Sequence, residues 1–358
     1  MISPSAPKGL WAWGQDTNGQ LGFGDVVLRS SPTQVGALTT WSIISGGTAH
    51  SLAIKTDGTL WVWGHNESGR LGLGDVVQRS SPVQIGALAT WSAVAGDTRH
   101  SVAVKTDGTL WVWGSNDNGS LGLGDAVYRS SPVQIGTLAT WASISGGNVF
   151  SLAIKTNGTL WAWGQGSQGR LGLGDVIYRS SPVQIGTLAT WTSASGGTRS
   201  ALAVKTDGTL WSWGYGTLGV LGQGDGIYRS SPVQVGTLTT WASTSSGADH
   251  STAVKTDGTL WTWGQNNGGH LGLADLIKRS SPVQVGTLAT WSAVSGGEGV
   301  SFAIKADGTL WSWGRNPHGN LGVGDSVYRS SPVQIGTLAT WTRLAKGSQM
   351  AHLLGLHT

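Results

Sequence analysis

Histidine is the side chain of this sequence with the widest chemical repertoire, because imidazole can bind a metal ion or transfer a proton near neutral pH. No two histidines show the HExxH spacing or another spacing typical of paired metal ligands. His50, His100 and His250 recur at one position of a repeated segment, but Phe150 and Ser200 stand at that position elsewhere. We therefore predict structural roles and no metal site. The eight histidines are His50, His65, His100, His250, His270, His318, His352 and His357.

Carboxylates also recur, each four residues before an arginine, as in Asp25 and Arg29. This spacing favours a local ion pair that braces a loop, because one carboxylate per loop cannot supply the oxygen ligands of calcium. The adjoining Gly-x-Leu-Gly-x-Gly-Asp segment has no following lysine and no predicted helix, which argues against phosphate binding. No Ser, His and Asp set carries a catalytic signature, so we predict no catalytic residue, no enzymatic activity and no cofactor.

A tryptophan-rich segment must position these residues, because Leu10 to Gly14 returns every fifty residues as Leu-Trp-x-Trp-Gly. A fixed period of this length indicates a repeat architecture. The spacing never drifts, so no repeat carries an insertion. The first tryptophans of the seven copies are Trp11, Trp61, Trp111, Trp161, Trp211, Trp261 and Trp311.

Each repeat contains four short apolar runs bounded by Gly, Pro or Asp-Gly, which predict strands. In the first repeat they cover residues 10–14, 33–35, 41–45 and 51–55. Asp57-Gly58 lies between two of these runs and favours a two-residue type I′ hairpin turn. Four antiparallel strands per fifty residues are typical of a propeller blade.

The chain ends predict how the ring closes. Residues 341–345 and 350–356 supply only two strands, and residues 10–14 and 33–35 supply the missing two. We therefore predict an all-β, seven-bladed β-propeller of four-stranded antiparallel blades, in which N- and C-terminal strands share one blade. One domain would cover residues 1–358, with blades at about 41–90, 91–140, 141–190, 191–240, 241–290, 291–340, and 341–358 with 1–40.

Two tryptophans of each repeat stand two residues apart in one strand and so project from the same face. Burying one indole removes about 200 Å² from water, a gross gain of about 5 kcal/mol before chain entropy is subtracted. With 21 tryptophans in the chain, packing between blades is the favoured role, and a platform for stacking sugars or bases is the alternative.

The copies differ mainly in two segments, residues 15–20 and 48–50 with their counterparts. Both follow strands that run in the same direction, so they should share one rim of the ring, which we call the variable rim. The Thr-Asp-Gly turns should form a nearly uniform opposite rim. A rigid scaffold that presents loops for binding would show this pattern, and so would drift at tolerant loop tips. Candidate binding residues on the variable rim are His65, Arg70, Arg99, Phe150, Arg170, Arg199, Tyr215, His270 and Arg315.

Composition narrows the functional classes. The formal net charge is +4, but lysines and arginines are dispersed, so nucleic-acid binding is not favoured. The absence of cysteine excludes disulfide and thiolate-metal frameworks and leaves the compartment open. No signal peptide or transmembrane segment is visible in the given chain, so we expect a soluble protein, with no membrane partner and a monomeric state, of unknown localisation.

The segment 63–75, followed by Ser81-Pro82 and by residues 96–104, closely resembles the regulator of chromosome condensation repeat. Seven such units cover nearly all the chain, and the style is that of compact bacterial members without insertions. The resemblance implies a seven-bladed propeller whose ring is closed by both chain ends. It also implies that His50, His100 and His250 form hydrogen bonds that brace a turn.

The resemblance implies several functions. The founding member exchanges nucleotide on a small GTPase through an inserted wedge, which the uniform spacing here leaves no room for. A plant ultraviolet photoreceptor of the same fold uses tryptophans where this chain has small or polar residues. Bacterial members that inhibit β-lactamases bind protein through one loop-bearing face. We expect a non-enzymatic binding scaffold for a macromolecular partner, with protein favoured; a structural or carbohydrate-binding propeller is the alternative, and a guanine nucleotide exchange factor is less favoured.

Overall fold

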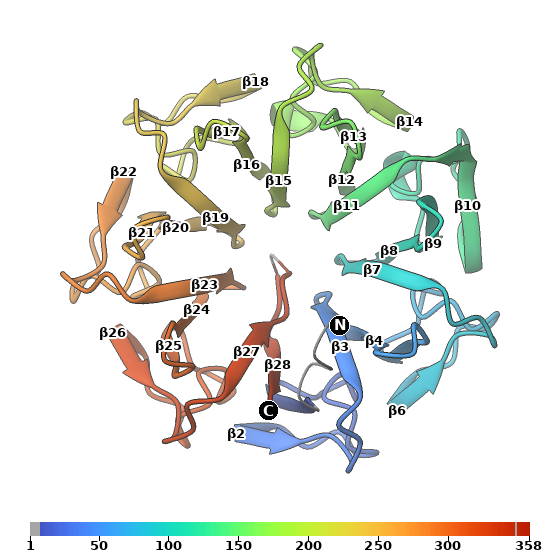
Figure 1. Cartoon of the computed structure of the whole chain (residues 1–358), viewed down its shortest axis with the longest axis horizontal. Helices are drawn as coiled ribbons and strands as arrows, with labels where there is room; N and C mark the ends of the chain where they lie inside the picture. Colours follow the sequence, from blue (N-terminus) through green and yellow to red (C-terminus); the bar gives the residue numbers. More distant parts are fainter. Residues whose placement is uncertain (1–7, 348) are drawn as a thin grey trace, which may run out of the picture.

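The computed structural model describes residues 8–347 and 349–358. Seven four-stranded antiparallel sheets stand around a central axis like the blades of a propeller (Figure 1). The predicted all-β, seven-bladed architecture is therefore confirmed. No helix in the described part of the chain is long and apolar enough to cross a membrane.

The strands of a blade follow one another from the axis to the outer edge. The innermost strands are β3 (Trp41–Gly46), β7 (Trp91–Gly96), β11 (Trp141–Gly146), β15 (Trp191–Gly196), β19 (Trp241–Ser246), β23 (Trp291–Gly296) and β27 (Trp341–Leu344). The second strands are β4 (His50–Lys55), β8 (His100–Lys105), β12 (Phe150–Lys155), β16 (Ser200–Lys205), β20 (His250–Lys255), β24 (Val300–Lys305) and β28 (His352–His357).

The third strands carry the Leu-Trp-x-Trp-Gly segment: β1 (Gly9–Gly14), β5 (Leu60–Gly64), β9 (Thr109–Gly114), β13 (Leu160–Gly164), β17 (Leu210–Gly214), β21 (Leu260–Gly264) and β25 (Leu310–Gly314). The outermost strands are β2 (Arg29–Gln34), β6 (Arg79–Gln84), β10 (Arg129–Ala139), β14 (Arg179–Gln184), β18 (Arg229–Gln234), β22 (Arg279–Gln284) and β26 (Arg329–Gln334). Two short 3₁₀ helices, η1 (Asp117–Gly119) and η2 (Ser167–Gly169), lie in loops of the variable rim.

The closing blade combines both chain ends in the strand order β2-β1-β28-β27. Strands β1 and β28 pair without interruption from Gly9 opposite His357 to Gly14 opposite His352. The ring is thus closed by backbone hydrogen bonds between the first and last strands, as the strand count predicts.

Two local predictions are wrong. The outermost strand begins at Arg29 rather than Thr33, because its polar first half still pairs with β1, at Gly14. The Asp57-Gly58 turn is not a type I′ turn, because only Gly58 has a positive φ, of 82°. Lys55 N–H donates to the Thr59 carbonyl at 3.0 Å, so residues 56–58 form a three-residue loop that ends in a left-handed glycine.

The tryptophans form the core between blades, as predicted. Trp63 is fully buried, and its indole N–H donates to the backbone carbonyl of Gln20 in the preceding repeat at 2.8 Å. Trp41 packs edge-on against Trp61 at a centroid distance of 6.1 Å. The Lys55 ammonium lies 3.6 Å from the Trp61 ring centroid and covers its outer face. Comparable lysine–tryptophan contacts recur in six blades, so the partly exposed tryptophans already hold a cation from the chain.

His50, His100 and His250 form side-chain contacts with neighbouring blades. His50 Nε2 lies 3.0 Å from Ser101 Oγ of the next blade, and the Ser101 hydroxyl donates to the Arg70 carbonyl at 2.8 Å. The same contact joins His100 to Ser151 at 2.9 Å and His250 to Ser301 at 2.7 Å. Of the three, His100 also makes a polar contact with its own turn, where its Nδ1 lies 3.1 Å from the Asp97 carboxylate.

Candidate functional site

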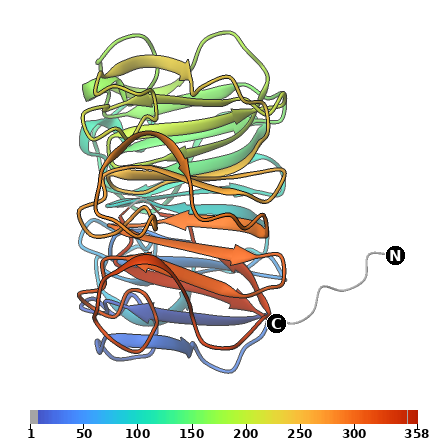
Figure 2. The ribbon, with the colours of Figure 1, turned by 90° about the vertical axis from the view of Figure 1, so that its left-hand side faces the viewer.

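The variable segments do lie on one face of the ring. The loop from β3 to β4 meets the longer loop from β5 to β6, since His65 N–H donates to the Ala49 carbonyl at 2.8 Å. Figure 2 shows, from the side, hairpin loops gathered on two opposite faces of the ring. The variable rim therefore presents two loops from each blade on a single surface.

Side-chain hydrogen bonds within the long loops of the variable rim hold their shape, as in the loop from β5 to β6. Asn66 Oδ1 accepts the Leu71 N–H at 2.9 Å, and Asn66 Nδ2 donates to the Asp75 carboxylate at 3.0 Å. Asp75 also pairs with Arg79 at 2.6 Å. The hydrogen bond from the Val77 N–H, helped by the Arg79 guanidinium, holds the pKa of Asp75 below its usual value. The predicted Asp–Arg brace is present in all seven blades.

Part of the sequence variation is interior and has nothing to do with a partner. Residues at the position of Gln20 are buried in every repeat, because their carbonyls receive the indole N–H of the next blade. Three candidate binding residues belong to this set and are buried: Arg70, Arg170 and His270. Burial lowers the pKa of each guanidinium to about 10. Arg70 donates to the Thr98 carbonyl at 2.8 Å and thereby ties two loops together.

Phe150, another candidate binding residue, is fully buried. It occupies the position of the interblade histidines, and the next blade carries Ala201 where the histidine pairs have serine. Phe150 and Ala201 belong to the same core cluster. At this joint of the ring an apolar contact thus replaces the histidine–serine contact.

Two of the remaining candidates lie on separate blades. Arg99 is exposed and lies 3.6 Å from Asp117, which also accepts the Tyr128 hydroxyl. His65 is half-buried, 3.9 Å from Glu67, and burial lowers the pKa of its imidazole. Neither residue lines the pocket described next, so the structure does not bring all the candidates together.

A polar pocket of about 250 Å³ on the variable rim brings together Arg199, His270 and Arg315. The Arg199 guanidinium lies over the Tyr215 ring at 5.3 Å, and Arg315 donates to Asn267 at 2.9 Å. Burial, helped by the Arg315 charge, lowers the pKa of His270 to about 4, so this imidazole is neutral at pH 7. We call this the rim pocket.

Sequence reasoning missed three residues of the rim pocket. Asp249 and Glu298 add two carboxylates to the lining that contains Arg199 and Arg315. Gln349 reaches across the mouth of the ring: its side-chain oxygen accepts the Thr98 hydroxyl at 2.8 Å, and its amide donates to the Thr198 hydroxyl at 3.1 Å. The one sequence feature that pointed to Gln349 was that residues 346–350 differ from the corresponding residues of the other repeats.

The uniformity of the opposite rim has a structural cause. Asp57 Oδ1 accepts both the N–H and the hydroxyl of Thr59, at 2.9 and 2.7 Å, and the Thr59 hydroxyl accepts the Trp61 indole N–H at 2.9 Å. The fourth repeat has Asn157 at the position of Asp57, and its side-chain oxygen accepts the same two hydrogen bonds. The contrast between the rims is therefore weaker support for a binding role than the sequence alone suggests.

The rim pocket offers two fixed cations, two carboxylates and several amide and hydroxyl groups around one depression. These groups suit ionic and hydrogen-bonded contact with a folded surface. Among residues 8–347 and 349–358, no group of three or more histidines and carboxylates gathers closely enough to hold a metal ion.

Comparison with protein families finds a match for each of the seven repeats. The family profile described as the regulator of chromosome condensation (RCC1) repeat matches residues 9–54, 57–104, 107–154, 157–204, 207–254, 257–304 and 307–352. A second profile of the same description matches 41–70, 92–120, 141–170 and 241–269. Comparison with curated protein sequences finds no significant relative.

Solved structures share the fold. Human WBSCR16 is 21% identical, with a TM-score of 0.87, and the alignment covers 98% of this chain and 99% of that one. Yeast RCC1 (Prp20), solved bound to Kap60, is 21% identical with a TM-score of 0.86 and coverages of 98% and 89%. Prp20p from Saccharomyces cerevisiae, described with its binding to Gsp1p and histones, is 20% identical with a TM-score of 0.87 and coverages of 99% and 92%.

Proposed function

The chain belongs to the regulator of chromosome condensation repeat family, and from this premise we propose that it is a non-enzymatic scaffold that binds a protein partner through the variable rim. The observation that carries the proposal is the rim pocket, where loops from neighbouring blades converge on Arg199, Asp249, Glu298 and Arg315. Arginine and aromatic side chains supply much of the binding energy of protein interfaces, and Tyr215 beside Arg199 fits that composition.

Protein binding by relatives of the same fold supports the proposal. The titles of the yeast structures name Kap60, Gsp1p and histones as binding partners of Prp20. At about one fifth identity, those partners are not transferred to this chain. What transfers to the proposal is the use of the propeller as a protein-binding surface.

The alternatives gain less support. A carbohydrate-binding platform needs open aromatic faces, and here lysines cover the partly exposed tryptophans of six blades. Nucleotide exchange by an inserted wedge needs an insertion, and the repeats keep a constant spacing of fifty residues. Protein binding through rim loops, as in bacterial propellers without insertions, needs neither an open aromatic face nor an insertion.

The test is charge reversal within the rim pocket. Arg199→Glu with Arg315→Glu should weaken the binding of a partner recovered from the native source at least tenfold, because both cations would become repulsive to the same complementary surface. Affinity capture identifies the partner, and calorimetric titration with that purified partner measures the dissociation constant.

The matched control places two glutamates on the opposite rim, at the exposed positions Thr187 and Thr237. This variant should bind the partner like the unmodified protein. Equal affinity of the Arg199/Arg315 variant, or an equal loss in the control, would refute the proposed site.

A further inference from the structure

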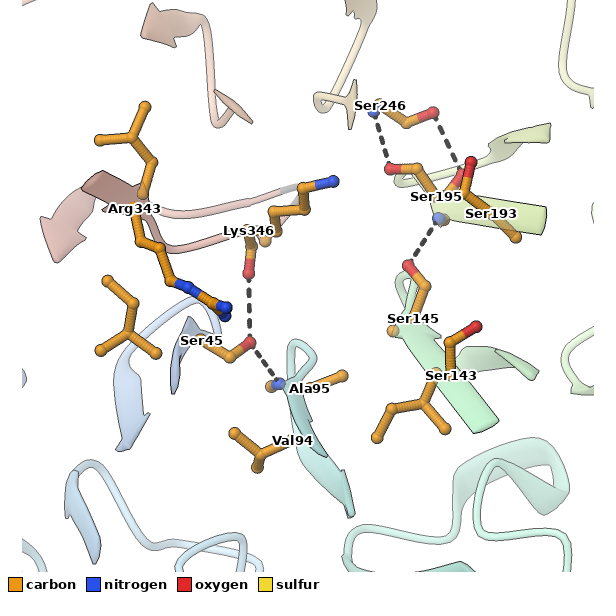
Figure 3. Close-up of a pocket in the computed structure, with 18 of the residues that line it drawn as sticks. Ser45, Val94, Ala95, Ser143, Ser145, Ser193, Ser195, Ser246, Arg343 and Lys346 are labelled. Atoms are coloured by element: carbon orange, nitrogen blue, oxygen red, sulfur yellow. Dashed lines mark hydrogen bonds between the residues drawn. The ribbon is translucent and has the colours of Figure 1, made fainter. Parts of the chain in front are cut away.

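A cavity of about 400 Å³ lies on the ring axis, separate from the rim pocket. Innermost strands of the blades line it, mainly with serine, alanine, glycine and branched apolar residues. Figure 3 shows Arg343 and Lys346 reaching into this space from the last blade, with Ser143, Ser145, Ser193 and Ser195 on the far wall. We call it the axial cavity.

Both cations are unique to the last blade. The position of Arg343 is Ile43, Ala93, Ser143, Ser193, Ser243 or Ala293 in the other repeats. The position of Lys346 is glycine in five of them and Ser246 in the sixth. An otherwise uncharged lining has therefore gained two positive charges at one place, which the repeat pattern does not require.

No acidic group balances these charges. The residues lining the axial cavity include no aspartate or glutamate. Among the described residues, neither Arg343 nor Lys346 forms an ion pair, and the Lys346 ammonium has one long hydrogen bond, 3.4 Å, to the Thr244 carbonyl. The surrounding protein lowers the pKa of Lys346 by desolvation, and no carboxylate offsets it.

Asp97 is a buried carboxyl group that follows the cavity-lining Gly96, and its polar contacts are with residues outside the cavity lining. Asp97 accepts the Thr98 N–H and lies 3.1 Å from His100 Nδ1. Burial raises the pKa of Asp97 well above its usual value, which favours the uncharged form. Asp97 therefore does not cancel the positive potential of Arg343 and Lys346.

The axial cavity is also lined by hydroxyl groups. Ser193 lines it, and its buried hydroxyl has no hydrogen-bond partner. Gln349 spans the axis on the variable-rim side through Thr98 and Thr198. Gln349, Thr98 and Thr198 do not line the axial cavity, so this hydrogen-bonded bridge is separate from it.

We propose that the axial cavity binds a small, multiply charged oxyanion, of the class of diphosphates and phosphorylated sugars. Arg343 offers a planar set of N–H donors, Lys346 a point charge and the serines neutral donors, and together these suit phosphoryl oxygens. Arg343 and Lys346 are both solvent-exposed at the cavity, so an entering ligand can reach them. The site is independent of partner binding at the variable rim, so either proposal can fail without the other.

The test uses inorganic pyrophosphate as the probe, titrated calorimetrically into the full chain at about 150 mM salt, where surface charges are largely screened. We expect saturable binding of one pyrophosphate per chain. Arg343→Ser and Lys346→Ser should each weaken it at least tenfold, and the double variant should abolish it. Both substitutions place residues found at the same position of other blades, so the fold accommodates them.

Two controls test whether pyrophosphate binding depends on Arg343 and Lys346 in particular. Lys278→Gln removes an exposed cation from an outer loop and should leave pyrophosphate binding unchanged. Melting curves followed by tryptophan fluorescence should be the same for all variants without ligand. Absence of saturable binding, equal affinity in the double variant, or equal weakening by Lys278→Gln would overturn the proposal.

Discussion

The histidine position shows how single residues set the joints between blades. Where the chain has His50, His100 or His250, the following blade has serine within 3.0 Å of the imidazole. Where it has Phe150, the following blade has alanine. At the joint that closes the ring, His352 pairs with Gly14 as His50 pairs with Gly64, and its imidazole lies 2.8 Å from the Ser51 hydroxyl. The residue at the histidine position and the residue facing it in the next blade are thus either both polar or both apolar in these pairs. A single repeat viewed alone would not show this correlation.

This pairing predicts an energetic coupling between His250 and Ser301. Ser301→Ala should destabilise the protein by about 1–3 kcal/mol, because the buried Nε2 of His250 loses its partner. The same change made together with His250→Phe should cost less, since it recreates the Phe150 and Ala201 joint. Denaturant unfolding of the two single variants and the double variant measures the coupling, and the cycle cancels the packing cost of the larger ring.

Additive effects in that cycle would show that the two side chains do not interact, and would refute the interblade role of the histidines. Burial lowers the pKa of His250 to about 3, so measurements at pH 7 report on the neutral imidazole.

At the level of elements, tryptophan periodicity predicts the strands well because each third strand is buried between blades. The outermost strands are harder to predict, since Arg29, Ser30 and Ser31 pair at an exposed edge and show no apolar pattern. The sequence predicted the loops of the candidate site but not which of their side chains are exposed. Sequence variation located the rim loops, but it could not distinguish exposed Arg199 from buried Arg170, which the packing of the next blade covers.

Close contact between a loop and the next blade predicts a matched pair of glycine substitutions. Gly172 has a φ of +73°, and a Cβ there would lie 2.8 Å from Trp213 Nε1; Gly186 has a φ of +60° and open space around it. Gly186→Ala should cost about 1 kcal/mol for the left-handed backbone, and Gly172→Ala about 2–4 kcal/mol because the tryptophan must also shift. Thermal and denaturant unfolding provide the comparison, and equal costs would contradict the close packing of loop on indole.

The whole molecule depends on pairing its two ends. Each family repeat, such as residues 57–104, begins in one blade and ends in the next, so every repeat covalently links two neighbours. The offset leaves two strands over at each end, and these meet in the closing blade. The sequence predicts this closure by counting strands. It does not predict the axial cavity, because Arg343 and Lys346 become neighbours of distant serines only when the ring is complete.

Deleting residues 1–40 should therefore open the ring. The deletion removes β1 and β2, exposes the edge of β28, and takes away Trp13, which is fully buried and donates to the Asn320 carbonyl at 3.1 Å. Loss of a buried tryptophan alone costs about 3–5 kcal/mol, so we expect a lower melting temperature and a broader transition in calorimetry. The control is a circular permutant that begins at residue 41 and joins residue 358 to residue 1, because it keeps every strand and should melt cooperatively. A deletion variant that melts like the intact chain would disprove closure by the paired ends, since the sheet β2-β1-β28-β27 could then contribute nothing to holding the other six blades together.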